Sequence, residues 1–178
     1  PSFLTGARLV AAGQAARLYD LAAQEPVQRA IVGDALINDR GLLPYNHLPF
    51  LALALAPFAD VPLETSYVIW MAATLLALAG ALALLTGELL VYSGPRPWRQ
   101  IPLIWATLGL WGLALGFFPL FNSLLAAQVT AWVLLSGAVT VRAFRTGHEG
   151  WADVALAGGL LKPQLIIVPL LVLLVLRR

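Results

Sequence analysis

The sequence predicts an all-α fold: a multipass transmembrane helical bundle with an external juxtamembrane helical segment. Two observations predict this class. Hydrophobic residues make up 60% of the 178 residues and charged residues only 11%, whereas a soluble domain carries about 25% charged residues. The apolar residues also gather in runs that approach the ~20 helical residues needed to cross a bilayer. Because the sequence starts at Pro1 and ends within an apolar pattern, we expect a fragment of a longer protein.

The chain divides into two parts near residue 62. Residues 1–61 mix acidic and basic side chains, and we expect them to form external juxtamembrane or interfacial helices. Residues 62–178 carry the long apolar runs, and we expect them to form the transmembrane part. The helices expected there are 63–85, 101–118, 120–141, 151–161 and 165–176.

The first part is expected to be helical in pieces. Phe3–Gln24 is rich in Ala, Leu, Arg and Gln, which favour helices. Pro26 is expected to begin a second piece, roughly Val27–Leu36, and residues 38–41 are expected to form a turn. Leu48–Phe58 is apolar but too short to span, so we expect an interfacial or partly inserted helix.

Clusters of arginine predict the orientation of the spans, because cytoplasmic loops carry an excess of Arg and Lys. The spans 101–118 and 120–141 separate two arginine-bearing loops, so both loops can lie inside and the turn near Pro119–Asn122 outside. Residues 1–61 then lie outside as well. The arginines concerned are Arg96, Arg99, Arg142, Arg145, Arg177 and Arg178.

Lys162 is the leading candidate for a functional residue. It lies between two uncharged apolar runs, Val154–Leu161 and Leu165–Leu176. A charged side chain at membrane depth costs about 3 kcal/mol on insertion scales, and it usually faces a cavity, a partner or a substrate.

The segment 151–176 has two interpretations. It is either one kinked helix or two short arms, 151–161 and 165–176, that turn at Lys162-Pro163-Gln164. We favour the two arms, because short broken helices are tolerated where they line a protein cavity. This arrangement puts Lys162 and Gln164 on the same outer side as residues 1–61.

Composition excludes several kinds of site. The sequence has no cysteine and only two histidines, His47 and His148, far apart in the chain. Thiolate chemistry is therefore excluded, and a histidine metal site is not expected. A net charge of +2 gives no reason to expect a nucleic-acid partner. We expect no metal ion and no cofactor.

Several short motifs follow one another in an order that points to a known family. They are Phe3–Arg8, Gly13-Gln14, Leu18–Asp20, Pro44–Phe50, Ala56–Ala59, Trp70, Gln128–Thr130, Arg142 and Gly158–Gln164. In this order, over almost the whole chain, the sequence resembles glycosyltransferase family 87, multipass enzymes of the GT-C class. Two motifs depart from the family. Ala127-Gln128-Val129-Thr130 stands where the family usually shows Gly-Gln-x-Asn, and Asn46-His47-Leu48-Pro49 stands where it often shows a Tyr-x-Pro-Pro-like sequence.

The resemblance implies an integral membrane hexosyltransferase. Members of the family look like polyprenol-phosphate-mannose-dependent α-1,2-mannosyltransferases of mycobacteria and relatives. It thus implies inverting transfer of a hexose, with mannose the expected sugar, from a polyprenyl-phosphate donor to a glycolipid or glycan acceptor. The active side would face outward from a bacterial plasma membrane, and membrane lipids would be further partners. It also implies an acidic catalytic base in the first external loop, which we expect upstream of Pro1.

Such a site needs groups that bind the donor phosphate and the sugar. Lys162 suits the phosphate, because stabilisation of a leaving anion is strongest in a water-poor site, but it could also snorkel to the interface. The other candidates for donor-phosphate or substrate binding are Gln164, Gln128, Arg8, Tyr45, Asn46, Tyr19 and Asp20. Each has a structural alternative as a turn residue, a helix end or a contact between helices.

Two functions from other classes stay open at this point. A secondary transporter or permease would also explain a broken helix with a polar turn, and it predicts paired broken helices in inverted repeats. The sequence offers only one such element. A non-catalytic membrane scaffold would leave a cationic turn on the side of the external segment unexplained.

Overall fold

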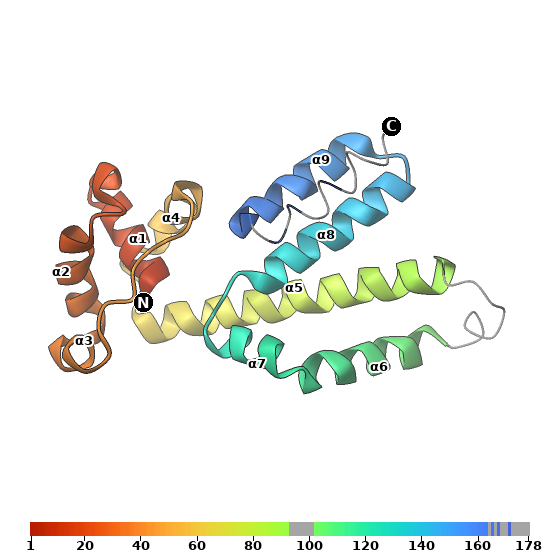
Figure 1. Cartoon of the computed structure of the whole chain (residues 1–178), viewed down its shortest axis with the longest axis horizontal. Coiled ribbons are helices and arrows are strands. Elements are labelled where there is room, and N and C mark those ends of the chain that lie inside the picture. Colours follow the sequence, from red (N-terminus) through yellow and green to blue (C-terminus); the bar gives the residue numbers. More distant parts are fainter. Residues whose placement is uncertain (93–101, 164, 166, 168–170, 172–178) are drawn as a thin grey trace. The chain divides into compact units, whose positions relative to one another are not determined.

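The computed structural model describes residues 1–92, 102–163, 165, 167 and 171. Within these residues every regular element is a helix (Figure 1), which confirms the all-α class. The chain forms two compact units, Pro1–Ile69 and Trp70–Arg178. The boundary between them falls inside helix α5, Leu63–Tyr92.

The first unit consists of short helices that lead into α5. Its elements are α1 Ser2–Ala11, η1 Ala15–Arg17, α2 Leu21–Val32, α3 Asp34–Arg40, α4 Pro49–Leu55 and η2 Ala56–Phe58. Its core is formed by Leu9, Leu18, Ala23, Tyr45 and Ala52. Burial of these apolar side chains holds the short helices together, since helices of this length are marginal in isolation.

Helix α2 begins at a side-chain cap. Asp20 Oδ1 accepts the N–H of Ala22 at 2.9 Å, the usual role of an N-cap aspartate. A hydrogen bond from Arg17 holds the pKa of the Asp20 carboxyl below its ordinary value. The helix therefore starts ahead of Pro26, which lies inside α2. The sequence predicts that Pro26 begins a new helix, and this prediction is wrong. Pro26 is exposed, so the N–H bond that it removes is lost on the solvent side.

Two buried glutamines of α2 hold the extended segment that leads to α4. Gln24 Oε1 accepts the N–H of Tyr45, and Gln28 Oε1 accepts the N–H of Leu43, both at 2.7 Å. Gln28 Nε2 donates in return to the carbonyl of Leu43 at 2.9 Å. The two amides thus satisfy backbone groups that would otherwise need a partner strand or water.

Tyr45 is fixed in the core of the first unit, where it is 1% exposed. Its hydroxyl donates to the Leu48 carbonyl at 2.8 Å and accepts the N–H of Ala52 at 3.0 Å. Burial raises the pKa of Tyr45 to about 12, so the phenol stays protonated near neutral pH. A Cβ on Gly6 would lie 2.6 Å from Cδ2 of this ring, so α1 can approach it only with glycine there.

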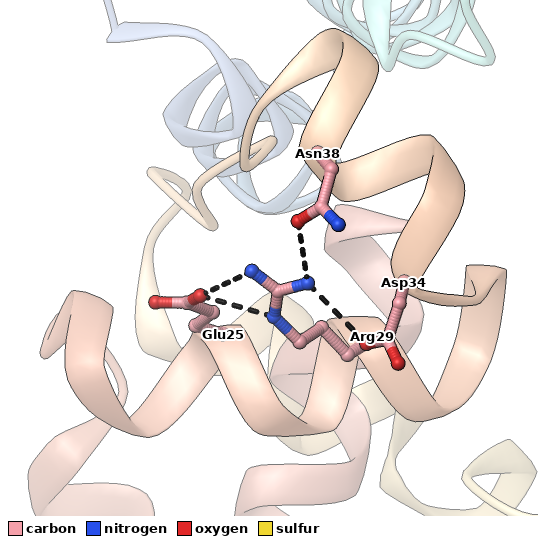
Figure 2. A network of polar contacts seen from close by, with 4 residues as sticks. All are labelled: Glu25, Arg29, Asp34 and Asn38. Atoms are coloured by element: carbon pink, nitrogen blue, oxygen red, sulfur yellow. Dashed lines mark hydrogen bonds and ion pairs between the residues drawn. The ribbon is translucent and has the colours of Figure 1, made fainter.

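Arg29 joins α2 to α3 (Figure 2). Its guanidinium donates to Glu25 Oε1 from Nη2 at 2.7 Å and from Nε at 3.0 Å. Nη1 reaches across to Asp34 at 3.3 Å and to Asn38 at 3.0 Å, both on α3. The planar fork of arginine can serve several acceptors at once, so one side chain fixes the turn between the two helices.

The second unit contains the longer apolar helices. After α5 come α6 Leu103–Gly116, α7 Phe118–Leu125, α8 Thr130–Arg145, α9 Glu149–Ala157 and the 3₁₀ turn η4 Gly158–Leu161. Its core is formed by Leu78, Leu82, Leu124 and Ala131, from α5, α7 and α8. Residues of α6 pack against this core as well, among them Trp111 and Ala114.

The structure divides the segment 120–141, which the sequence predicts as one helix. Residues 118–125 belong to α7, and a turn at residues 126–129 separates them from α8. The preceding break also differs, because it falls at Phe117, which has an extended backbone, and not near Pro119. Pro119 lies in the first turn of α7, where a proline costs no intrahelical hydrogen bond.

Only part of the expected membrane topology is visible in these helices. In the described residues, Leu63–Glu88 is long and apolar enough to cross a membrane. A second candidate exists if Ile104–Gly116 and Phe118–Leu125, which are bent by 72°, count as one broken span.

Helices α8 and α9 form an antiparallel hairpin (Figure 1). Gly147, with a φ of 75°, ends α8 and allows the chain to turn back. Ser136 of α8 donates to the Ala155 carbonyl of α9. A Cβ on Gly158 would lie 2.7 Å from the Ser136 hydroxyl, so this close approach requires glycine. The hairpin returns the end of η4 to the beginning of α8.

Candidate functional site

Lys162 follows directly after η4, at a break in the helical backbone. Its φ of −145° and ψ of 79° are outside the helical region, and its carbonyl accepts the N–H of Leu165 at 2.9 Å. The first of the two expected arms therefore ends where the sequence places the turn. The second arm, 165–176, and Gln164 lie largely or wholly outside the described residues.

The side chain of Lys162 contacts the beginning of α8. Lys162 Nζ donates to Gln128 Oε1 at 2.8 Å and to Thr130 Oγ1 at 3.1 Å. Ser123 Oγ also donates to Thr130 Oγ1, at 2.9 Å. We call Lys162, Gln128 and Thr130 the lysine cluster. Two of these residues are candidates from the sequence, separated by 34 positions, and the hairpin brings them together.

The charge of Lys162 is not balanced within this cluster. An ammonium group has three donors and no acceptor, and the two partners that it contacts offer an amide and a hydroxyl oxygen. Among the described residues no carboxylate pairs with it. Gln128 is exposed and Lys162 is half-buried, so a ligand can reach both. One N–H donor and one positive charge are available to an anion.

The turn that carries Gln128 is strained. The N–H of Gln128 bonds to Ser123 O and that of Ala127 to Leu124 O, both at 2.9 Å, which is the Schellman arrangement at a helix end. This arrangement needs a left-handed residue, and Ala127 supplies it with a φ of 52°. For a residue with a Cβ this conformation costs about 1–2 kcal/mol. The matching positions after α1 and α8 are glycines, Gly13 and Gly147.

A second charged cluster lies at the other end of α8, and we call it the glutamate cluster. Glu88 of α5, with a side chain only 10% exposed, pairs through Oε1 with Arg142 at 3.1 Å and through Oε2 with Arg145. The two arginines are predicted from the sequence to be topology signals, and Glu88 is not among the candidates that the sequence offers. A single acid near the end of an apolar helix belongs to no recognisable sequence pattern. The available signal is the spacing of the two arginines, since residues three positions apart share one helix face and can meet the same acid.

The remaining sequence candidates lie in the first unit, where most have structural contacts. Arg8 Nε donates to the Ala59 carbonyl at 2.9 Å, just after η2. Tyr19 donates to the His47 carbonyl at 2.7 Å. Tyr45 and Asp20 have the core and cap contacts given above, and Asn46 is exposed.

The fold and the lysine cluster define a helical protein of membrane-protein composition with a candidate site for an anionic ligand. Residues 45–178 match the family model for glycosyltransferase family 87. Because this match covers more than half of the chain, the chain belongs to glycosyltransferase family 87, a family of membrane glycosyltransferases. The family expected from the motifs is thus confirmed. No curated protein and no solved structure matches the chain.

Membership of this family identifies the protein as a glycosyltransferase. The transporter and scaffold alternatives therefore lose their basis. A sugar donor and an acceptor are the partners that the family implies.

Proposed function

We propose that the protein transfers a hexose, with mannose the expected sugar, from a polyprenyl-phosphate donor to a glycolipid or glycan acceptor. In this proposal the enzyme is a multipass GT-C-type protein whose active side faces outward from the plasma membrane. Lys162 binds the phosphate of the donor. Gln128 and Thr130 hold its side chain in place before the donor arrives.

The observation that carries the proposal is the unbalanced charge of Lys162. Its ammonium contacts two neutral oxygens, 2.8 and 3.1 Å away, next to an exposed glutamine. A lysine with only the structural role of joining two helices would be expected to pair with a carboxylate, because a desolvated positive charge needs a negative charge to compensate it. A phosphate oxygen supplies that compensation and accepts the third N–H.

The start of α8 favours an anion at the same place. Thr130 is the first residue of this 16-residue helix, which has no side-chain cap at that end among the described residues. The positive end of a helix dipole repels a nearby cation and attracts an anion, by about 0.3–1 kcal/mol each. A phosphate bound to Lys162 would therefore interact favourably with both.

We place α4 and η2 at the outer membrane surface. Phe50, Leu53 and Phe58 are exposed on this segment, and η2 ends at Phe58, five positions before α5 begins. A linker of this length spans at most about 17 Å, so the apolar face cannot lie far from the bilayer if α5 crosses it. Interfacial helices bury such a face at the headgroup boundary.

The substitution Lys162→Ala in the full-length protein tests the phosphate role. Transfer from a polyprenyl-phosphate donor should fall at least ~100-fold, because the leaving phosphate loses its cation, while membrane insertion stays intact. Arg17→Ala is the control, since it removes an exposed cation of the first unit that pairs with Asp20, and transfer should stay within about twofold. Unchanged transfer in Lys162→Ala would contradict the proposal.

A further inference from the structure

The strained turn before α8 is tied to α5 by a tryptophan. Trp70 Nε1 donates to the carbonyl oxygen of Ala127 at 2.9 Å, across 57 positions of sequence. Both residues belong to the second unit. The carbonyl that receives this bond belongs to the one described non-glycine residue with a left-handed backbone.

The ring of a second tryptophan packs beside the first, and its indole N–H bonds to α5. The ring centroids of Trp70 and Trp132 lie 5.9 Å apart, and Trp132 Nε1 donates to Thr74 Oγ1 at 3.2 Å. Thr74 lies on α5, one turn after Trp70. The Trp70 ring is thus held between α5 and α8, so its N–H keeps a fixed direction toward Ala127.

The peptide that joins Ala127 to Gln128 sets the direction of the Gln128 side chain. If the Ala127 carbonyl turned away, the peptide plane would rotate and Gln128 Oε1 would leave Lys162 Nζ, which it now meets at 2.8 Å. An alanine has no intrinsic preference for the left-handed region, unlike glycine. An external hydrogen bond to its carbonyl therefore adds to the two backbone bonds of the turn in stabilising this conformation.

We propose that Trp70 is a positioning residue for the donor site: its indole N–H holds the Ala127 carbonyl, keeps the turn left-handed and thereby aims Gln128 at Lys162. Its effect on the donor KM rests on the proposed function, whereas its effect on the turn does not. Trp70 touches no reacting atom in this proposal.

The test compares Trp70→Phe with Trp132→Phe in the full-length protein. Both changes keep an aromatic ring and remove one indole N–H, but only the first N–H contacts the turn. In Trp70→Phe, amide hydrogen exchange in a peptide covering Ala127 and Gln128 should become at least ~10-fold faster, because their bonds to Leu124 O and Ser123 O open more often. The KM for the donor should rise about 5–10-fold with kcat nearly unchanged, and Trp132→Phe should change neither quantity more than about twofold.

A rescue separates positioning from general damage. Glycine adopts the left-handed region without strain, so adding Ala127→Gly to Trp70→Phe should return the donor KM to within about twofold of the parent. Should Trp70→Phe fail to accumulate, Ala127→Val provides a second route with Trp70 intact. A β-branched residue is a poor fit at positive φ, so this variant should show the same fast exchange and raised KM.

The outcomes distinguish this inference from the function on which it rests. Equal exchange rates in Trp70→Phe and Trp132→Phe would overturn the inference whatever the activity. Fast exchange with an unchanged donor KM would show that the turn is held but does not position the site, which would also overturn it. Unchanged transfer in Lys162→Ala would instead remove the proposed function, and the exchange measurement would still decide whether Trp70 holds the turn.

Discussion

The two ends of α8 differ in the partners that they offer to a buried or half-buried charge. At the glutamate cluster, one nearly buried acid meets two arginines, so every charge has a partner of opposite sign. At the lysine cluster, about 18 Å away along the helix, the partners of the cation within the described part of the chain are neutral oxygens. The comparison teaches that charge pairing separates the two clusters: where each charge has a partner of opposite sign the cluster joins helices, whereas an accessible cation with neutral partners can bind a ligand.

The strongest challenge to this comparison is to balance the lysine cluster. The substitution Gln128→Glu is nearly isosteric and puts a carboxylate where the amide oxygen now lies, 2.8 Å from Lys162 Nζ. The carboxylate would satisfy the lysine and repel a phosphate, so the donor KM should rise about 100-fold, or about 2.7 kcal/mol. The thermal midpoint should stay the same or increase.

The control for this change is Gln14→Glu, the same chemical change at an exposed residue of the first unit. Its effect on the donor KM should be less than about twofold. A donor KM that stays at the parental value in Gln128→Glu would mean that the charge of Lys162 is not used for binding.

The second challenge unbalances the glutamate cluster. In Glu88→Gln two arginines lose their counter-charge, and the free energy of unfolding should fall by about 2 kcal/mol, less than for a fully buried pair because both arginines remain partly exposed. The thermal midpoint should then drop by about 4–8 °C, with the donor KM within about twofold. Glu149→Gln, at an exposed position, is the control. A raised KM at an unchanged midpoint would reverse the two roles.

The smallest expected effects sharpen the comparison within the glutamate cluster. The Arg145 side chain is 29% exposed and that of Arg142 is 54% exposed. Because an exposed ion pair contributes little, Arg142→Gln should lower the free energy of unfolding by at most about 0.5 kcal/mol. Arg145→Gln should cost about twice as much. Equal losses in denaturation experiments would show that exposure does not rank the two pairs.

The sequence predicts those features of the fold that depend on a long run of similar residues or on adjacent residues. The all-α class follows from apolar runs such as 63–85, because a run of that length has few other stable solutions in an apolar setting. The break at Lys162 was visible for the same reason, as a single charge beside a proline in an apolar segment. These features depend on neighbours in the chain: helix α5 begins at Leu63 and runs on to Tyr92, past the predicted end at residue 85, and the backbone leaves the helical region at Lys162.

Features set by distant contacts were not predictable from the sequence. An alanine normally favours a helix, so nothing in its own chemistry marks Ala127 as left-handed, although the resemblance marked it as a departure from a glycine. Its carbonyl accepts a hydrogen bond from the indole of Trp70, 57 positions away in sequence, and this is the contact that we propose holds its conformation. In the same way, the contact of Lys162 with Gln128 depends on the course of the α8–α9 hairpin. The ion pairs of Glu88 with its two arginines depend on the position of α5 beside α8.

The α8–α9 hairpin also fixes a length. Helix α8 rises about 24 Å over its 16 residues, and the return from Glu149 to Leu161 covers about 21 Å, so Lys162 arrives level with Thr130. One inserted residue in α9 would rotate everything after it by about 100° and carry the lysine off the α8 face. Relatives that keep this cluster should therefore vary in length at the connection of residues 146–148 and keep the residue count of both helices constant.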